Sequence, residues 1–568
     1  VTDDDWEAIQ NDIAQFPIVP TYHKLPTRQS FSRYYLAYTD GFQKHFPFLH
    51  LPSLCLQRPY IELRLAIAAA GAQYCFEADK PEVLHLFHAA LAIAADRLRK
   101  KDAKVDSPQT PASCDDSASR DRKIRARSCS MFSGKASKPA SPKDEEDLLQ
   151  TAQTLFILLV IATGTDYREL WKEKATIQGM LANIIQEGGL RTGSVLQTPE
   201  SLGWKEYMRR ESAKRTTYAA FCFSNFDAFM NETAPVIPRS TLEFMALPIS
   251  AAEFEADTAA KWQEVRARSP AARPLLFTDA FNRLFREERL PPQMSALGNY
   301  VLIHAVTYEI HIRRHDRRYL GLTIHRYRAR RPNRLEQTLE GLQTAWKSSP
   351  RDPIGPMHPD ACPVTSSSLF ALLHFASIQL HALTTSKVDR TSQAAPLSLL
   401  PSRDPQKLAA AMRDYQFRLE FSEPMKLRKA LMHAIQAFSI PIGIGVNRAA
   451  NEPMFLSMME HAFPALEFAL LLSKWCLELS HRDSKDISRD ETAILEELNK
   501  LMRETRHPIK PGHYAFQTWA GDPNQWAKHH SVEVLRVWAD VYSGPQIWGL
   551  SKLVASSLNG YADFLQQT

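Results

Sequence analysis

The sequence predicts an all-α protein that forms an irregular multi-helix bundle. Its long periodic stretches are rich in Leu, Ala, Arg, Gln and Glu, which are strong helix formers. Runs in which β-branched and polar residues alternate are almost absent, and residues 238–248 allow at most a short extended piece. No repeat with a period of about 20 to 50 residues is visible, so we do not expect a regular solenoid.

The first block, residues 1–100, is expected to be the N-terminal helical part of the bundle. Its periodicity predicts helices over residues 31–45, 61–76 and 81–100. The segment after it, residues 101–147, consists of Ser, Pro, Asp, Lys and Arg with almost no large apolar residue. Such a segment cannot offset its ordering entropy by burial, so we expect a disordered insert.

A short loop sequence follows the first predicted helix and reads His45, Phe46, Pro47, Phe48, Leu49, His50. Pro47 should end the helix because it moves the preceding residue away from helical geometry. The aromatic side chains supply burial for the turn that follows. A metal site at His45 and His50 would lack a nearby Cys or carboxylate ligand, so we interpret the segment as a structural loop.

Helical periodicity resumes after the insert and defines the remaining blocks. We expect a central helical domain at 148–383, a flexible connection at 384–405 and a C-terminal helical block at 406–568. The longest apolar run, Leu155 to Ala162, is less than half of the roughly 20 residues that a membrane helix needs. We therefore interpret it as a core segment and expect no membrane partner.

One central helix, expected over 199–229, carries an ion pair on an apolar face. Thr198 would be its N-cap and Pro199 its first residue. Spacings of three and four place one set of side chains on a single face, namely Trp204, Met208, Glu211, Arg215, Tyr218 and Cys222. Glu211 and Arg215 are four residues apart in the favourable order. An exposed pair is one interpretation, but the aromatic neighbours favour a partly buried, structural pair.

Charge and cysteine usage exclude several classes of protein. A net charge of +6 over 568 residues is too small to mark the whole chain as a polyanion binder. The seven cysteines include no C-x-x-C pair, which argues against a disulfide framework and against a zinc module within this chain. No nucleophile elbow, phosphate-binding loop or dinucleotide fingerprint is present, so no catalytic residue is assigned and we expect no enzyme.

Two local clusters of basic residues are candidates for contacts with partners. The first is interpreted as a partner surface and includes Arg313, Arg314, Arg317, Arg318, Arg326, Arg328, Arg330 and Arg331. It could neutralise phosphates, or it could be a solvated helix end and loop facing an acidic protein surface. The second lies in the insert and consists of Arg122, Lys123, Arg125 and Arg127. It could serve nuclear import or belong to a merely solvated linker.

Several of these motifs occur in the order found in one known family. They are the tryptophan helix with Trp204, Glu211, Lys214 and Arg215, the loop from His45 to Pro52, the helix end at 184–191 and the closing helix around Trp538. In this respect the chain resembles the fungal-specific transcription factor domain, also called the middle homology region. The resemblance covers about 30–565 except the insert, and it implies an all-α regulatory domain.

The resemblance implies a nuclear regulator of RNA polymerase II transcription that responds to an effector or a partner. Zinc and DNA contact would belong to a module upstream of Val1, which we expect to be missing here, so no cofactor and no metal site is assigned to this chain. The expected partners are DNA through that module and the transcription machinery or co-regulators. A small-molecule effector and a homodimer are left open. The alternative is a helical small-molecule-binding or scaffold regulator without DNA binding.

Overall fold

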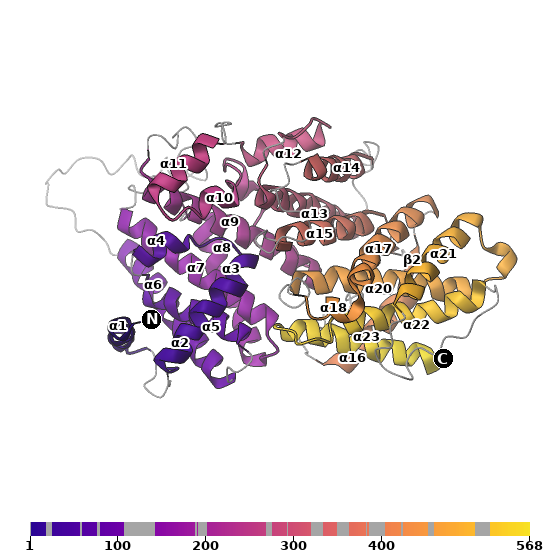
Figure 1. The fold of residues 1–568 in the computed structure, drawn as a ribbon, viewed down its shortest axis with the longest axis horizontal. Helices are drawn as coiled ribbons and strands as arrows, with labels where there is room; N and C mark the ends of the chain where they lie inside the picture. Colours follow the sequence, from indigo (N-terminus) through magenta and orange to yellow (C-terminus); the bar gives the residue numbers. More distant parts are fainter. Residues whose placement is uncertain are drawn as a thin grey trace, which may run out of the picture.

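The computed structural model describes most of the chain. The described residues are 2–18, 25–56, 59–75, 80–106, 142–187, 190, 202–268, 275–291, 294–319, 333–348, 363–381, 383–385, 404–421, 424–452, 459–505 and 523–567. Nearly all of them lie in helices, which confirms the all-α prediction. Figure 1 shows the chain running from the N-terminal helices on the left to the C-terminal helices on the right.

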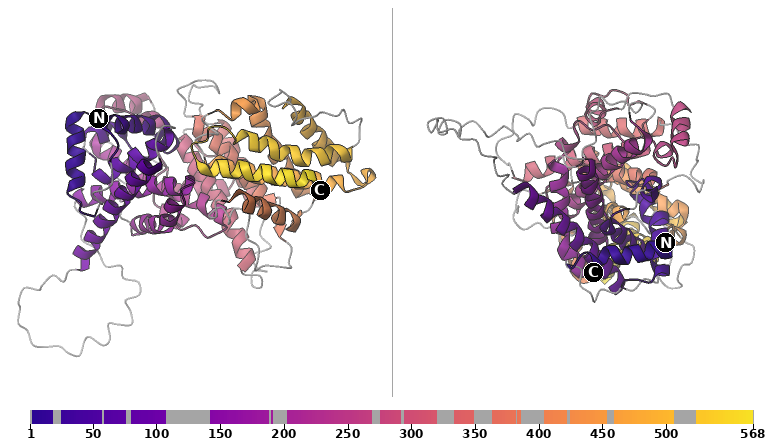
Figure 2. Two further views of the ribbon diagram at one scale, coloured as in Figure 1. Left: turned by 90° about the horizontal axis from the view of Figure 1, so that it is seen from below. Right: turned by 90° about the vertical axis from the view of Figure 1, so that its left-hand side faces the viewer.

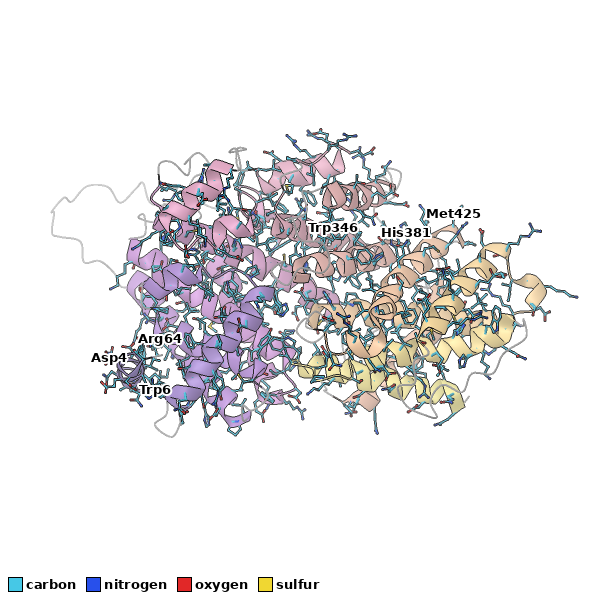
Figure 3. The ribbon with its side chains drawn as sticks, in the orientation of Figure 1. Asp4, Trp6, Arg64, Trp346, His381 and Met425 are labelled. Atoms are coloured by element: carbon cyan, nitrogen blue, oxygen red, sulfur yellow. The ribbon has the colours of Figure 1, made fainter. Side chains whose placement is uncertain are left out.

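The N-terminal helices surround two apolar helices, α5 and α7. The elements of this region are α1 (Asp3–Ala14), α2 (Arg28–Ala37), a π-helix (Tyr38–Phe42), α3 (Gln43–His45), α4 (Leu51–Leu56), α5 (Ile61–Tyr74), α6 (Lys80–Asp106), α7 (Pro142–Gly164) and α8 (Arg168–Gln186). Every residue of α5 from Ile61 to Ala72 is buried, including the charged Glu62 and Arg64, which pair with Arg97 and Asp12. Figure 3 shows Trp6 of α1 near Arg64 of α5 at the left edge of the molecule.

The apolar run in α7 is a core segment, as predicted. All residues from Leu155 to Ala162 are at most 3% exposed. One helix of the described chain, over Lys143–Gly164, is long and apolar enough to cross a membrane, but 94% of its most apolar window is buried inside the fold. Burial against neighbouring helices accounts for its composition.

The predicted insert is shorter at both ends than expected. Helix α6 continues to Asp106, because its last residues include good helix formers, and α7 already begins at Pro142. A proline at the first helical position costs no hydrogen bond, and Asp144 and Glu145 in the first turn favour the helix start. Residues 107–141, where disorder was predicted, lie outside the described residues.

The middle of the chain contains the predicted signature helix as α9 (Trp204–Asn231). The other elements are η3 (Arg239–Leu242), α10 (Ala251–Phe254), α11 (Ala259–Arg268), α12 (Phe277–Phe285), α13 (Ala296–Tyr319), α14 (Asn333–Ser348) and α15 (Pro363–His381). Helix α9 begins at Trp204 with Gly203 in the extended N-cap position, so the predicted start at Pro199 is wrong. Thr198 and Pro199 themselves lie outside the described residues. A Gly at the N-cap is also favourable, and the proline signal alone could not exclude it.

Among the described residues of the C-terminal region, all elements are helices except for one short strand pair. Its elements are β1 (Leu383–Thr385), α16 (Pro405–Arg418), β2 (Leu419–Phe421), α17 (Pro424–Ile444), α18 (Val446–Ala449), α20 (Met459–Ser480), η5 (Ser484–Asp486), α21 (Arg489–Glu504), α22 (Pro523–Val541) and α23 (Gly549–Gln567). Strands β1 and β2 are antiparallel, with Leu383 opposite Phe421. The predicted flexible connection at 384–405 therefore begins inside a strand, because Thr384 and Thr385 find a partner that is distant in sequence.

Helices α13 and α15 connect the N-terminal and C-terminal parts of the molecule, and α23 also contacts α7 directly. Helix α15 packs against α13 on one side and against α17 and α20 on the other. One continuous hydrophobic core extends from Ile9 in α1 to Leu565 in α23. In the view from below, Figure 2 shows the long α23 running from the middle of the molecule away from the N-terminal helices. This core crosses the boundaries between the predicted blocks, and the division of the chain into domains stays a prediction.

Candidate functional site

The loop after α3 packs against α7 and α9 and thereby connects the N-terminal helices to them. Phe46 leaves helical geometry with φ −124° and ψ 78°, as expected for a residue before proline. Its ring centroid lies 5.5 Å from that of Phe156 in α7 and 6.3 Å from that of Phe223 in α9. Phe48 packs edge-on against Phe156 at 5.0 Å. The loop is therefore a hydrophobic attachment point, as its aromatic residues predicted.

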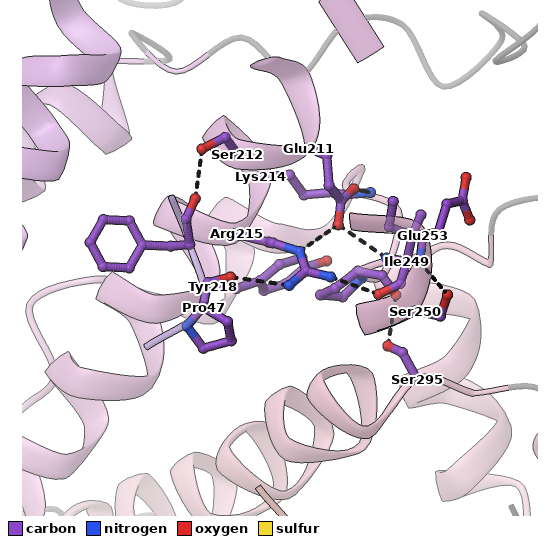
Figure 4. Close-up of polar contacts among 12 residues, drawn as sticks. Pro47, Glu211, Ser212, Lys214, Arg215, Tyr218, Ile249, Ser250, Glu253 and Ser295 are labelled. Carbon is purple, nitrogen blue, oxygen red and sulfur yellow. Dashed lines mark hydrogen bonds and ion pairs between the residues drawn. The ribbon is translucent and has the colours of Figure 1, made fainter. Parts of the chain in front are cut away.

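Arg215 of α9 binds three separate parts of the chain, as Figure 4 shows. Its Nη1 donates to the carbonyl oxygen of Pro47 at 3.0 Å, and its Nη2 donates to that of Ile249 at 2.8 Å. Its Nε donates to Oε1 of Glu211 at 2.9 Å. The guanidinium carbon also lies 3.8 Å from the ring centroid of Phe254. We call Arg215, Glu211 and the carbonyls of Pro47 and Ile249 the Arg215 anchor.

Both charges of the predicted pair are buried and paired. The Arg215 and Glu211 side chains are each 2% exposed. Oε1 of Glu211 also accepts from the backbone N–H of Ile249 at 3.1 Å, and its other oxygen forms an ion pair with Lys214. Lys214 in turn donates to the carbonyl of Leu247 at 3.3 Å. Burial lowers the pKa of Arg215 while the Glu211 carboxylate opposes that effect, and an arginine stays charged under these conditions.

Hydroxyl groups on the same face of α9 add further contacts to backbone carbonyls. Ser212 donates to the carbonyl of Phe48 at 2.6 Å, and Tyr218 donates to that of Ala246 at 3.1 Å. Figure 4 also shows Ser295 near these residues, where its hydroxyl donates to the Pro248 carbonyl at 2.7 Å. These acceptors were not predicted, since every residue carries a carbonyl and the sequence does not show which ones lie near the helix.

The two histidines of the loop pack as neutral side chains. Nδ1 of His50 accepts from the backbone N–H of Ser53 at 3.2 Å, so its Nε2 carries the proton and donates to the Ala256 carbonyl at 3.3 Å. Burial lowers the pKa of His50 and lowers that of His45 to about 3. Within the described part of the chain, no group of three or more His, Cys, Asp or Glu side chains is arranged to hold a metal.

The two signature tryptophans lie in different regions. Trp204 is the first residue of α9, and its ring centroid is 5.7 Å from that of His50, so it belongs next to the anchor. Trp538 lies in α22, is 3% exposed and packs against Phe438 and Tyr542. The structure therefore places Trp538 in the C-terminal core, among contacts separate from those of the anchor.

The basic clusters are described only in part. Arg313 is exposed on α13, with its Nε 3.9 Å from Oε2 of Glu309. The next three arginines lie on the last turns of α13, and their side chains are outside the described set: Arg314, Arg317 and Arg318. The remaining members of both clusters lie outside the described residues: Arg326, Arg328, Arg330, Arg331, Arg122, Lys123, Arg125 and Arg127. Their proposed roles stay predictions.

Two family models match the chain and together cover most of its length. The first, described as the fungal specific transcription factor domain, matches residues 17–348. The chain belongs to the fungal specific transcription factor domain family. The second, described as the fungal transcription factor C-terminal domain, matches residues 393–560. No curated protein matches, and no solved structure matches either.

Family membership gives the anchor its context. The Arg215 anchor and the loop from His45 to His50 lie within the match to the fungal specific transcription factor domain, and Trp538 lies within the match to the C-terminal domain. The resemblance inferred from the sequence motifs is confirmed. The chain is thus a domain of a fungal transcription regulator, a class of domain that is generally not enzymatic.

Proposed function

We propose that this chain is the regulatory domain of a zinc-dependent fungal transcription factor that acts on RNA polymerase II promoters in the nucleus. It senses an effector or a protein partner and sets the activity of a zinc-bearing DNA-binding module encoded upstream. The observation that carries the proposal is the pair of family matches, over residues 17–348 and 393–560. Zinc and DNA contact belong to the proposed upstream module, and the transcription machinery or co-regulators are the proposed partners.

The Arg215 anchor supports a regulatory role because it couples distant segments. One side chain connects the loop after α3, the signature helix α9 and the segment before α10. Close-packed, fully paired elements move together rather than independently. A ligand or partner that displaced α9 would therefore also displace the N-terminal helices, which gives a physical route from a binding event to an attached module.

A reporter assay tests the transcriptional role. Residues 1–568 are fused to a heterologous DNA-binding module, and reporter output is compared with that of the module alone at equal protein level. We expect a several-fold change, in either direction, that Arg215→Met abolishes. Arg210→Met is the matched control, because Arg210 pairs with Glu206 on the half-exposed side of the same helix and should keep the change. An unchanged reporter with the folded wild-type fusion would contradict the proposal.

The upstream module is tested separately by sequencing the 5′ end of the transcript. An in-frame set of Cys and His residues with zinc-module spacing upstream of Val1 is the expected result. A stop codon or an initiator codon directly before Val1 would contradict that part of the proposal. The chain would then be a helical regulator without DNA binding, and the search would turn to small molecules and scaffold partners.

A further inference from the structure

A carboxyl group is buried where the two family-matched regions meet. Glu460, in the first turn of α20, is 2% exposed. The Tyr300 hydroxyl of α13 donates a hydrogen bond to its Oε2. Tyr300 belongs to the region that matches the fungal specific transcription factor domain, and Glu460 to the region that matches the C-terminal domain. The contact therefore joins the two regions directly.

Several polar atoms around this contact lack hydrogen-bond partners within the described structure. They are Oε1 of Glu460, both ring nitrogens of His304 and Oδ1 of Asn225. The His304 ring centroid is 4.6 Å from that of Tyr300, and Nδ2 of Asn225 donates to the His304 carbonyl at 3.4 Å. His304 and Asn225 are both fully buried. The thiol of Cys222 in α9 interacts electrostatically with the Glu460 carboxyl group. We call Tyr300, His304, Asn225, Cys222 and Glu460 the polar joint.

The electrostatics of the polar joint oppose an ionised Glu460. Among the described residues no ion pair involves this carboxyl group, in contrast to Glu211 of the anchor, which has two cationic partners. An unpaired buried carboxylate is strongly unfavourable, so a closed, dry joint requires the neutral acid. An ionised Glu460 must regain water, which separation of the first turn of α20 from Tyr300 of α13 would supply.

We propose that the polar joint is a proton-controlled connection between the two family-matched regions, closed when Glu460 is protonated and loosened when Glu460 is ionised. Loosening would separate the first turn of α20 from α13 and α9 while the rest of each region stays folded. The joint would exist whether or not the chain senses an effector or works with DNA.

The surrounding groups agree with a transition near neutral pH. Burial raises the pKa of Glu460 to about 7, and the Tyr300 hydrogen bond opposes this effect. The titratable groups of the joint are Tyr300 and His304 on α13 and Cys222 on α9, with His461 next on α20. Burial raises the pKa of Tyr300 and Cys222 and lowers that of His304 and His461, so all four stay neutral near pH 7. Among these groups of the joint, only Glu460 then changes charge.

Hydrogen exchange measured at pH 5.5 and pH 8 tests the joint in the full chain. Protection factors, corrected for intrinsic exchange, are measured for peptides from α13 and from the start of α20. The Glu460→Gln variant provides the reference, since an amide cannot ionise and the buried histidines titrate in both proteins. Relative to that variant, wild-type protection at the joint should fall by about 30-fold as the pH rises, because the open state releases the Glu460 proton.

Two further variants keep the test decisive. Tyr300→Phe removes the hydrogen bond that lowers the pKa of Glu460, so its opening transition should move to higher pH even if Glu460→Gln fails to fold. Glu533→Gln is the matched control: Glu533 is also a buried acid whose pKa burial raises to about 7, but it lies in α22. Any of three results would overturn the proposal. They are equal pH dependence of protection in wild type and Glu460→Gln, an opening transition at unchanged pH in Tyr300→Phe, and loss of the pH dependence in Glu533→Gln.

Discussion

At the residue scale, arginine has a specific role at position 215. Its three donors point at acceptors from three chain segments, Glu211, Pro47 and Ile249. The rigid fork of a guanidinium can serve such divergent acceptors at once, whereas a lysine ammonium on a flexible stem cannot do so with comparable geometry. Because Glu211 is also paired with Lys214, the buried carboxylate keeps one cation when Arg215 is replaced.

Arg215→Met should destabilise the chain by about 3 kcal/mol, because it leaves buried acceptors unpaired and removes one of two cations beside Glu211. Urea denaturation followed by circular dichroism measures this as a lower midpoint. Arg210→Met serves as the control, since its pair with Glu206 is partly exposed and should be worth about 0–1 kcal/mol. Equal midpoints for the two variants would show that the anchor is not a stabilising centre.

At the element scale, one glycine permits a close helix crossing. Gly71 lies in the buried helix α5, and a Cβ atom placed there would lie 1.8 Å from the backbone carbonyl oxygen of Tyr34 in α2. That contact is impossible without moving α2, because the obstacle is backbone rather than a flexible side chain. Gly179 in α8 is the opposite case, with open space around an added Cβ.

Gly71→Ala should lower the stability by about 1–3 kcal/mol through overpacking of α2 against α5. Gly179→Ala should raise it by about 0.5–1 kcal/mol, since alanine loses less conformational freedom in a helix. Thermal denaturation of the two variants side by side checks the opposite signs. A stabilised Gly71→Ala variant would mean that α2 is not held against α5 in solution.

At the scale of the whole molecule, buried histidines should make the chain sensitive to acid. Burial lowers the pKa of His45 and His304 to about 3 and that of His461 to about 4. Below pH 6.5 the unfolded chain binds protons that the folded chain cannot bind, so stability falls as the pH falls from 6.5 toward 3. The effect of Glu460 on stability has the opposite sign, because its raised pKa makes the folded chain bind a proton more tightly, so its contribution falls as the pH rises.

Urea midpoints measured between pH 7.5 and pH 4 should therefore decrease steadily on the acid side. The variant His304→Phe should show a weaker decrease, because an apolar ring of similar shape fills the site without a proton equilibrium. His481 is exposed in the turn after α20, and His481→Phe is the matched surface control for a His-to-Phe change. A midpoint that stays constant between pH 7.5 and pH 5 would contradict the prediction.

Sequence patterns alone determined the fold class, the helices at 61–76 and 81–100, the core run from Leu155 to Ala162 and the Glu211–Arg215 pair. Each depends on periodicity or spacing within one helix, which is local information. The family was also recognisable, since its motifs occur in order along the chain.

Only the tertiary structure decided which segments meet. Three contacts join residues that are far apart in the chain. They are the hydrogen bonds from Arg215 to the Pro47 and Ile249 carbonyls, the pairing of β1 with β2, and the hydrogen bond from Tyr300 to Glu460. Every residue has a backbone carbonyl, so the sequence does not show which carbonyl will accept a given hydrogen bond. The residues next to Glu460 in the sequence likewise do not indicate that its carboxyl group is buried without a cation. Contacts of this kind depend on how the helices pack against one another, and that is a property of the folded chain as a whole.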